Sequence, residues 1–104
     1  MELRLENFQE SPTYFFRRCG YGVYGAATSD NEWSFVRRLS SGDYPRFHVY
    51  AKMDGDDFLV NLHLDQKRPS YEGTRAHSGE YDGALVVEEA ERIKTYANQN
   101  KTVR

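Results

Sequence analysis

The chain has 104 residues, of which 38% are hydrophobic and 14% aromatic, and its formal net charge is -2. This length predicts a single domain, residues 1–104, that buries one core without metal or disulfide support. The small net charge excludes the basic excess that is typical of general polyanion binders. The lone Cys19 excludes an intrachain disulfide and favours a reducing cytoplasmic setting. No apolar run approaches the roughly 20 residues that span a bilayer.

The N-terminal segment carries two short patterns. Leu3 and Leu5 alternate with charged residues and predict either a short edge strand or a loose arm. Residues 12–19 are compatible with a helix, because Ser11 can cap it and Pro12 suits its first position. They are also compatible with a strand, because Thr-Tyr-Phe-Phe has high β propensity. We favour a strand or extended chain here.

The next segment predicts a first pair of strands. Residues 20–28 alternate, and their small side chains leave room for close approach of another element. Residues 29–31, Ser-Asp-Asn, are typical of a turn. Residues 33–39 fit either a strand with Trp33 and Phe35 on one face, or a short capped helix. The intervening turn favours the strand.

Residues 46–65 have the clearest pattern, that of an antiparallel hairpin. Both halves alternate apolar and polar residues around the turn sequence Asp-Gly-Asp-Asp at 54–57. Two registers, shifted by two residues, keep the apolar side chains on one face. We favour the register that pairs opposite charges across the strands. Its pairs are Met53 with Phe58, Tyr50 with Asn61, His48 with His63, and Arg46 with Asp65.

A long loop and a helix complete the chain. Residues 66–83 have no periodicity and are rich in glycine and hydroxyl groups; such a length is uncommon in a compact domain and typical of a functional segment. Residues 84–97 predict a helix, because their apolar positions approximate a stripe and glutamates stand in the early turns, where they suit the helix dipole.

Together these patterns predict an α+β fold. An antiparallel sheet of about four strands, in meander order, packs one face against the C-terminal helix. The expected core contains Trp33 or Phe35 together with Phe47, Val49, Phe58, Val60, Leu62, Leu64, Leu85 and Ile93. The opposite face carries Tyr50, Asn61, His48 and His63, and we expect residues 66–83 to fold near it.

The three histidines define the first candidate site. His48 lies opposite His63 in the favoured register, and Asp65 shares their face. Imidazole and carboxylate groups bind divalent transition metals and also perform acid–base chemistry near neutral pH. The chain has neither an HExxH motif nor paired cysteines, so the metal or cofactor stays unknown. The structural alternative is a simple cross-strand histidine pair. Three loop residues can fold over this face: His77, Glu80 and Asp82.

Cationic residues interleaved with aromatic ones form the second candidate, a surface for single-stranded RNA. Arginine pairs follow aromatic residues in segments 14–18 and 33–38, and Lys67 and Arg68 precede Tyr71. Nearby acidic residues nearly cancel these charges. The structural alternative is therefore a set of solvated basic residues whose aromatic neighbours lie in the core.

The third candidate is an anion or ligand clamp within residues 67–83. Hydroxyls, backbone N–H groups and glycines in segments 67–73 and 77–83 can surround an anion just before the helix start. The Gly-Lys-Ser/Thr ending of a Walker loop is absent. The structural alternative is that Asp82 caps the helix and the glycines only turn the chain.

From these candidates we favour a small cytoplasmic binding module that holds a small anionic ligand, a peptide or an RNA segment. The competing class is an enzyme, a small hydrolase or phosphoesterase, with or without a divalent metal, whose catalytic residues are His48, His63 and His77. Exposed strand edges can also pair two copies into a homodimer. The expected binding residues are Asp65, Lys67, Arg68, Tyr71, Tyr50, Asn61, Glu80 and Asp82.

Overall fold

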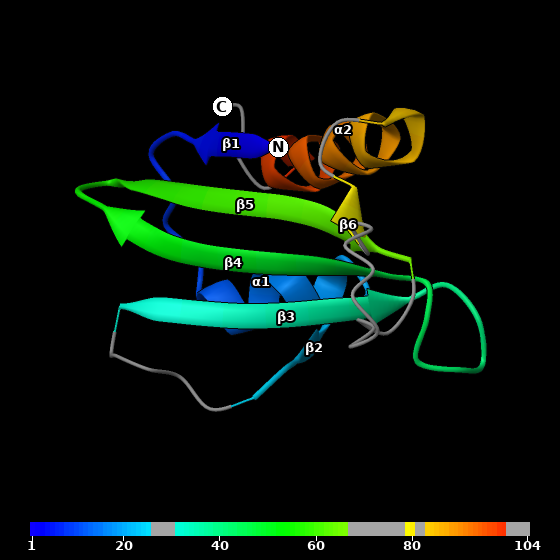
Figure 1. The fold of residues 1–104 in the computed structure, drawn as a ribbon. Helices are drawn as coiled ribbons and strands as arrows, with labels where there is room; N and C mark the ends of the chain where they lie inside the picture. The colour runs from blue at the N-terminus through cyan, green and yellow to red at the C-terminus, as the bar shows by residue number, and fades with distance from the viewer. Residues whose placement is uncertain (26–30, 67–78, 81–82, 100–104) are drawn as a thin grey trace.

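The computed structural model describes residues 1–25, 31–66, 79–80 and 83–99. They form an antiparallel sheet with two helices against one face (Figure 1), which confirms the α+β class. Neither helix in this part of the chain combines the length and apolarity needed to cross a bilayer. The elements are β1 (Glu2–Leu5), α1 (Pro12–Arg18), β2 (Gly22–Val23), β3 (Glu32–Arg38), β4 (Arg46–Asp54), β5 (Asp57–Asp65), β6 (Gly79–Glu80) and α2 (Ala84–Gln99).

The sheet has the strand order β1-β5-β4-β3-β2, and β6 also pairs with β5. Strands β2 to β5 form the predicted meander. The sheet exceeds the four or so strands expected because β1 and β6 both pair with β5. Between β1 and β2 the chain passes behind β3 and β4 as α1 (Figure 1). The homodimer expected through a strand edge stays a prediction.

The central hairpin has the favoured register throughout. His48 lies opposite His63, and Arg46 lies opposite Asp65. The last pair before the turn joins positions 54 and 57, so the loop consists of two residues, 55 and 56. Gly55 has φ 63°, and a positive φ at the first central residue is what the favoured two-residue hairpin loops require.

The strand favoured for residues 12–19 is wrong, because the chain forms helix α1 there. Ser11 is extended, and its side chain accepts a hydrogen bond from the backbone N–H of Tyr14. The helix directs Phe15 and Phe16 together into the core, where both are fully buried. A strand would send these neighbours to opposite faces, so tertiary burial overrides their β propensity.

The strand interpretation of residues 33–39 is confirmed by β3, which pairs with β4 along its whole length. Phe35 is buried and Trp33 is partly buried on the helix side. Within the described residues 20–25 the strand is limited to Gly22–Val23. Residues 26–30, which include most of the predicted turn, lie outside the described part.

The core fills the space between the helices and the inner face of the sheet. Every sheet residue predicted for the core is buried there. The prediction that Leu85 belongs to the core is wrong, because Leu85 is 50% exposed and the next residue, Val86, is buried in its place. The core also contains aromatic rings from outside the sheet. These are Phe8, Phe15, Phe16 and Tyr21.

A buried carboxylate attaches α2 to the rest of the molecule. Glu89 accepts hydrogen bonds from Tyr21 Oη at 2.6 Å and from Arg92 Nε at 2.9 Å, and Arg37 Nη1 lies 3.4 Å away. Arg92 also donates to the backbone carbonyl of Cys19, just after α1. The charge of Glu89 is therefore paired and hydrogen-bonded, as a buried charge must be.

Candidate functional site

The outer face of the sheet, which points away from the helices, carries a compact polar cluster. The β4–β5 register places two cross-strand pairs of this face next to each other, and β3 adds a hydroxyl beside them. We call the set the outer cluster. It consists of Tyr24, Ser34, Arg46, His48, His63 and Asp65.

Asp65 is the centre of the outer cluster. His63 Nε2 lies 3.0 Å from Asp65 Oδ1, and His48 Nδ1 lies 3.4 Å from Asp65 Oδ2. Arg46 Nε donates to Asp65 Oδ2 at 3.2 Å. One carboxylate therefore orients two imidazoles and one guanidinium, each from a position that strand alternation and register bring to the same face.

The His48 ring contacts polar and aromatic side chains around it. Its Nε2 lies 3.0 Å from Ser34 Oγ. Its ring stacks on Tyr50 at 4.3 Å between centroids and meets the edge of Tyr24 at 5.1 Å. With its Nδ1 proton directed at Asp65, the Nε2 atom accepts a hydrogen bond from the Ser34 hydroxyl, so both ring nitrogens are satisfied.

Arg46 is fixed between two aromatic rings. Its guanidinium carbon lies 4.7 Å from the ring centroid of Tyr24 and 4.6 Å from that of Tyr44. Tyr24 Oη also accepts a hydrogen bond from Arg46 Nη2 at 3.4 Å. A planar guanidinium suits this cation–π arrangement better than an ammonium group does.

Desolvation sets the charge state of the two histidines. Burial lowers the pKa of both His48 and His63, although the carboxylate of Asp65 acts in the opposite direction. Both imidazoles are therefore neutral at neutral pH. Among the described residues, every buried side-chain nitrogen or oxygen has a hydrogen-bond partner. The outer cluster is a satisfied network of the kind that holds its members in one geometry.

A shallow hollow of about 360 Å³ adjoins the outer cluster on the same face. Tyr50 stands at its border with 53% of its surface exposed. The side chains that line it are of mixed chemistry, with acidic, basic, amide and aliphatic groups. Those that share the outer face with Tyr50 are Glu2, Glu32, Lys52, Leu59 and Asn61.

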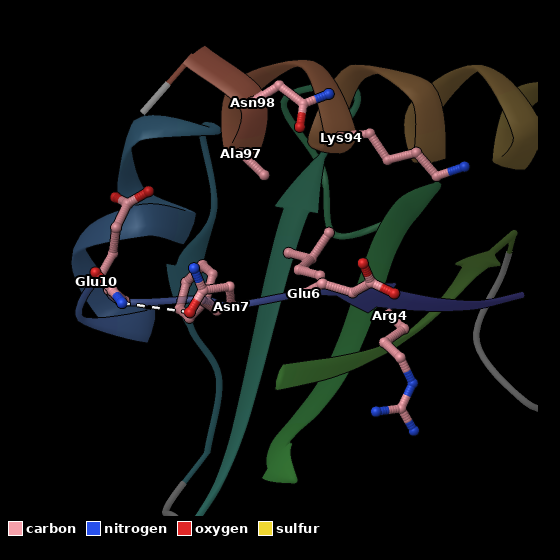
Figure 2. A pocket seen from close by; sticks show the side chains of 10 residues that line it. Arg4, Glu6, Asn7, Glu10, Lys94, Ala97 and Asn98 are labelled. Atoms are coloured by element: carbon pink, nitrogen blue, oxygen red, sulfur yellow. Dashed lines mark hydrogen bonds between the residues drawn. The ribbon is translucent and has the colours of Figure 1, made fainter. Parts of the chain in front are cut away.

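A second hollow, of about 690 Å³, lies between the end of β1, the segment that follows it and the last turns of α2. Figure 2 shows Lys94 and Asn98 on the helix, Glu6 and Asn7 across the hollow from them, and Glu10 at one end. Two of its charged groups are already paired, since Arg4 binds Asp54 and Asp57 and Glu10 binds Arg18. Within the described part of the chain, no predicted site residue lines this hollow.

The structure brings part of the predicted site together. His48, His63 and Asp65 meet, and Tyr50 lies opposite Asn61 on the same face. The backbone of Glu80 pairs with β5. The remaining predicted residues, and with them the placement of the 66–83 loop over this face, lie outside the described part. They are Lys67, Arg68, Tyr71, His77 and Asp82.

Sequence reasoning missed three contacts of the outer cluster. Ser34 alternates with Trp33 and Phe35 in the strand interpretation, and this alternation was a usable signal for its place on the outer face. Tyr44 lies in the irregular connection between β3 and β4, where periodicity carries no signal. The alternation of residues 20–28 assigned Tyr24 to a face but gave no indication of its contacts with His48 and Arg46. Comparisons of the chain with protein-family models, curated proteins and solved structures return no match.

Proposed function

We propose that the chain is a small soluble binding module of the cytoplasm that holds a short peptide on the outer face, beside Tyr50. The observation that carries this proposal is the state of the Tyr50 side chain, which is 53% exposed yet stacked on the buried ring of His48. The ring of His63 lies 5.9 Å away on the same face. A rigid exposed aromatic ring offers contact area with little loss of side-chain entropy.

The lining of the adjoining hollow favours a peptide over other ligands. Among the described residues that line it, two are acidic, Glu2 and Glu32, and one is basic, Lys52. Such a surface repels a phosphate backbone, whereas Asn61 and Leu59 suit the mixed polar and apolar groups of a peptide. Residues 66–83 are proposed to add contacts from the side of the outer cluster.

Three of the arginines in the candidate RNA surface are paired with carboxylates. Arg37 contacts the buried carboxylate of Glu89, and Arg38 pairs with Asp43 at 3.2 Å. Arg46 is held by Asp65 within the outer cluster. Binding to nucleic acid depends on cations that can replace the counterions of phosphates. These contacts leave a nucleic-acid interface with less support than a peptide site.

A hydrolase or phosphoesterase is the second candidate, because Asp65 orients two neutral imidazoles at 3.0 and 3.4 Å. Imidazoles in this state can accept a proton during hydrolysis. His48 is only 5% exposed, so a substrate would have to approach through His63. Hydrolysis of a generic ester or phosphoester that is abolished by His63→Ala and retained by Tyr50→Ala would favour this class over the binding module.

A displayed library of random peptides, selected against the full chain, tests the binding module. We expect Tyr50→Ala to weaken the selected peptides at least about tenfold, which is the loss of roughly 1.4 kcal/mol. Tyr14→Ala is the matched control, because Tyr14 is also an exposed tyrosine, at 61%, but lies on α1 behind the sheet. The control should bind as the unaltered protein does.

Single-stranded RNA and inorganic phosphate are measured in the same format at low and high salt. Steeply salt-dependent RNA binding that is lost in Tyr50→Ala would replace the peptide with a nucleic-acid ligand. Selected peptides that bind Tyr50→Ala and the unaltered protein equally well would overturn the proposed site.

A further inference from the structure

We infer that His48, His63 and Asp65 form a binding site for a divalent transition metal, of which zinc is the best match. Each residue offers one ligand atom, and these atoms all lie within 4.8 Å of one another. They come from the adjacent strands β4 and β5, whose pairing fixes their relative positions. Two imidazoles and one carboxylate are a ligand set that binds zinc and related metals.

The distances suit a metal with short bonds. Ligand atoms that bind zinc tetrahedrally at about 2.0–2.1 Å lie about 3.3 Å apart. His63 Nε2 and Asp65 Oδ1 are already 3.0 Å apart, and His48 Nδ1 is 3.4 Å from the other carboxylate oxygen. Since 4.8 Å is the outer limit of the set, the farthest pair has to close by about 1.5 Å, which ring and carboxylate rotation can supply.

The neighbours of the three residues are placed as the outer partners of metal ligands usually are. Ser34 Oγ lies 3.0 Å from His48 Nε2, the ring nitrogen that faces away from Asp65. Arg46 Nε donates a hydrogen bond to Asp65 Oδ2, and the other carboxylate oxygen, Oδ1, lies next to His63. Hydrogen bonds of this kind orient ligand side chains and are a regular part of metal sites.

The hydroxyl of Ser34 can hydrogen-bond to His48 in the tautomer that a bound metal requires. When a metal binds His48 Nδ1, the proton of the neutral ring moves to Nε2, and the number of protons on the ring does not change. A hydroxyl both donates and accepts hydrogen bonds, so Ser34 Oγ then accepts from Nε2 at the same position. The Ser34 contact is therefore compatible with both tautomers.

The number of protein ligands and the nearby charges determine which further ligand the bound metal can take. Three protein ligands leave at least one position for water or for an anionic group. An anion there would offset the positive charge of Arg46, whose guanidinium is held between two tyrosine rings close to Asp65. Calcium and magnesium prefer sites built from oxygen alone, so we expect neither of them to bind here.

Isothermal titration of the chelator-treated full chain with zinc chloride tests the site. We expect one zinc ion per chain, no heat from magnesium, and at least about tenfold weaker zinc binding in Asp65→Asn. Asp43→Asn is the matched control, because Arg38 Nε lies 3.2 Å from Asp43 Oδ1 as Arg46 Nε lies 3.2 Å from Asp65 Oδ2. Asp43 lies in the connection between β3 and β4, outside the strand pairing that brings Asp65 beside the histidines, so this variant should keep full zinc affinity.

A second measurement uses the unaltered protein, so its result does not depend on whether the Asp65→Asn variant folds. Long-range proton–nitrogen spectra of the unaltered protein report the imidazole nitrogens directly. Zinc should shift the resonances of His48 and His63 together. A shift of His77 alone, or the absence of any shift at millimolar zinc, would overturn the inference. Because the probe is the metal alone, this result is independent of whether a peptide binds beside Tyr50.

Discussion

Phe16 on α1 packs against four other rings, and Phe16→Ala is expected to bring the protein close to unfolding. Its ring is fully buried and stacks on Phe35 at 4.7 Å between centroids. It meets Phe15 and Tyr21 edge to face at 5.1 and 5.3 Å, and lies 6.2 Å from Phe58. Truncating a buried phenylalanine costs about 3–5 kcal/mol, a large part of the roughly 5–15 kcal/mol that stabilises a domain of this size.

Tyr14→Ala and Phe15→Ala, measured beside Phe16→Ala, make the experiment decisive. Tyr14 is 61% exposed on the same helix, so its removal should cost less than about 1 kcal/mol. An extended segment would instead place Tyr14 and Phe16 on one face and Phe15 on the other. Urea unfolding followed by circular dichroism gives the three free energies of unfolding. A neutral Phe15→Ala, or a Tyr14→Ala as costly as Phe16→Ala, would refute the packing of α1.

Three further results are expected. Burial raises the pKa of the Cys19 thiol to about 12, so a thiol reagent at neutral pH should label the protein only as fast as it unfolds; rapid labelling of the native state would contradict this. Tyr21→Phe removes the 2.6 Å hydrogen bond to Glu89 and should lower the free energy of unfolding by about 1.5–3 kcal/mol in urea, whereas a loss within error would show that the bond contributes nothing. In metal-free protein, desolvation holds the pKa of His48 and His63 below their ordinary 6.5, so below that pH the unfolded chain binds more protons than the native one. The urea midpoint should therefore fall on acidification from about pH 7.5 through 6.5, and a midpoint that stays constant or rises would exclude this linkage.

The hairpin was predictable down to single pairs because two independent signals agree there. Alternation over residues 46–65 assigns the faces, and the opposite charges of Arg46 and Asp65 select between registers that bury the same side chains. The pairing of His48 with His63 follows from that choice. Where two local signals conflicted, as in residues 12–19, the β propensity that we followed pointed to the wrong element, and the Ser11 cap with Pro12 pointed to the right one.

The errors in the helices have a common physical cause. In α1, the positions of Phe15 and Phe16 only make sense once a sheet is present to receive both rings on one side. In α2, the choice between Leu85 and Val86 depends on how the helix is rotated about its axis. That rotation is set in part by the burial of Glu89 among Tyr21 and two arginines, and an acidic residue gives no such signal in a sequence.

The candidate site was predictable only where one hairpin supplies all its members. His48, His63 and Asp65 belong to β4 and β5, so alternation and register were sufficient. Ser34 comes from β3, and its contact depends on how two strands align across an irregular connection. Tyr44 lies in that connection, and its stacking on a guanidinium depends on a backbone path that no periodic pattern describes.

Strand β4 is covered on both faces along Arg46 to Val49, whereas Tyr50 and Lys52 are exposed on its outer side. Saturation mutagenesis along this strand should therefore find four consecutive intolerant positions, followed by a permissive one at every second residue. The first two of these permissive positions, Tyr50 and Lys52, border the shallow hollow. An engineer could thus redesign ligand preference at Tyr50 and Lys52 while leaving untouched the part of the strand on which folding depends.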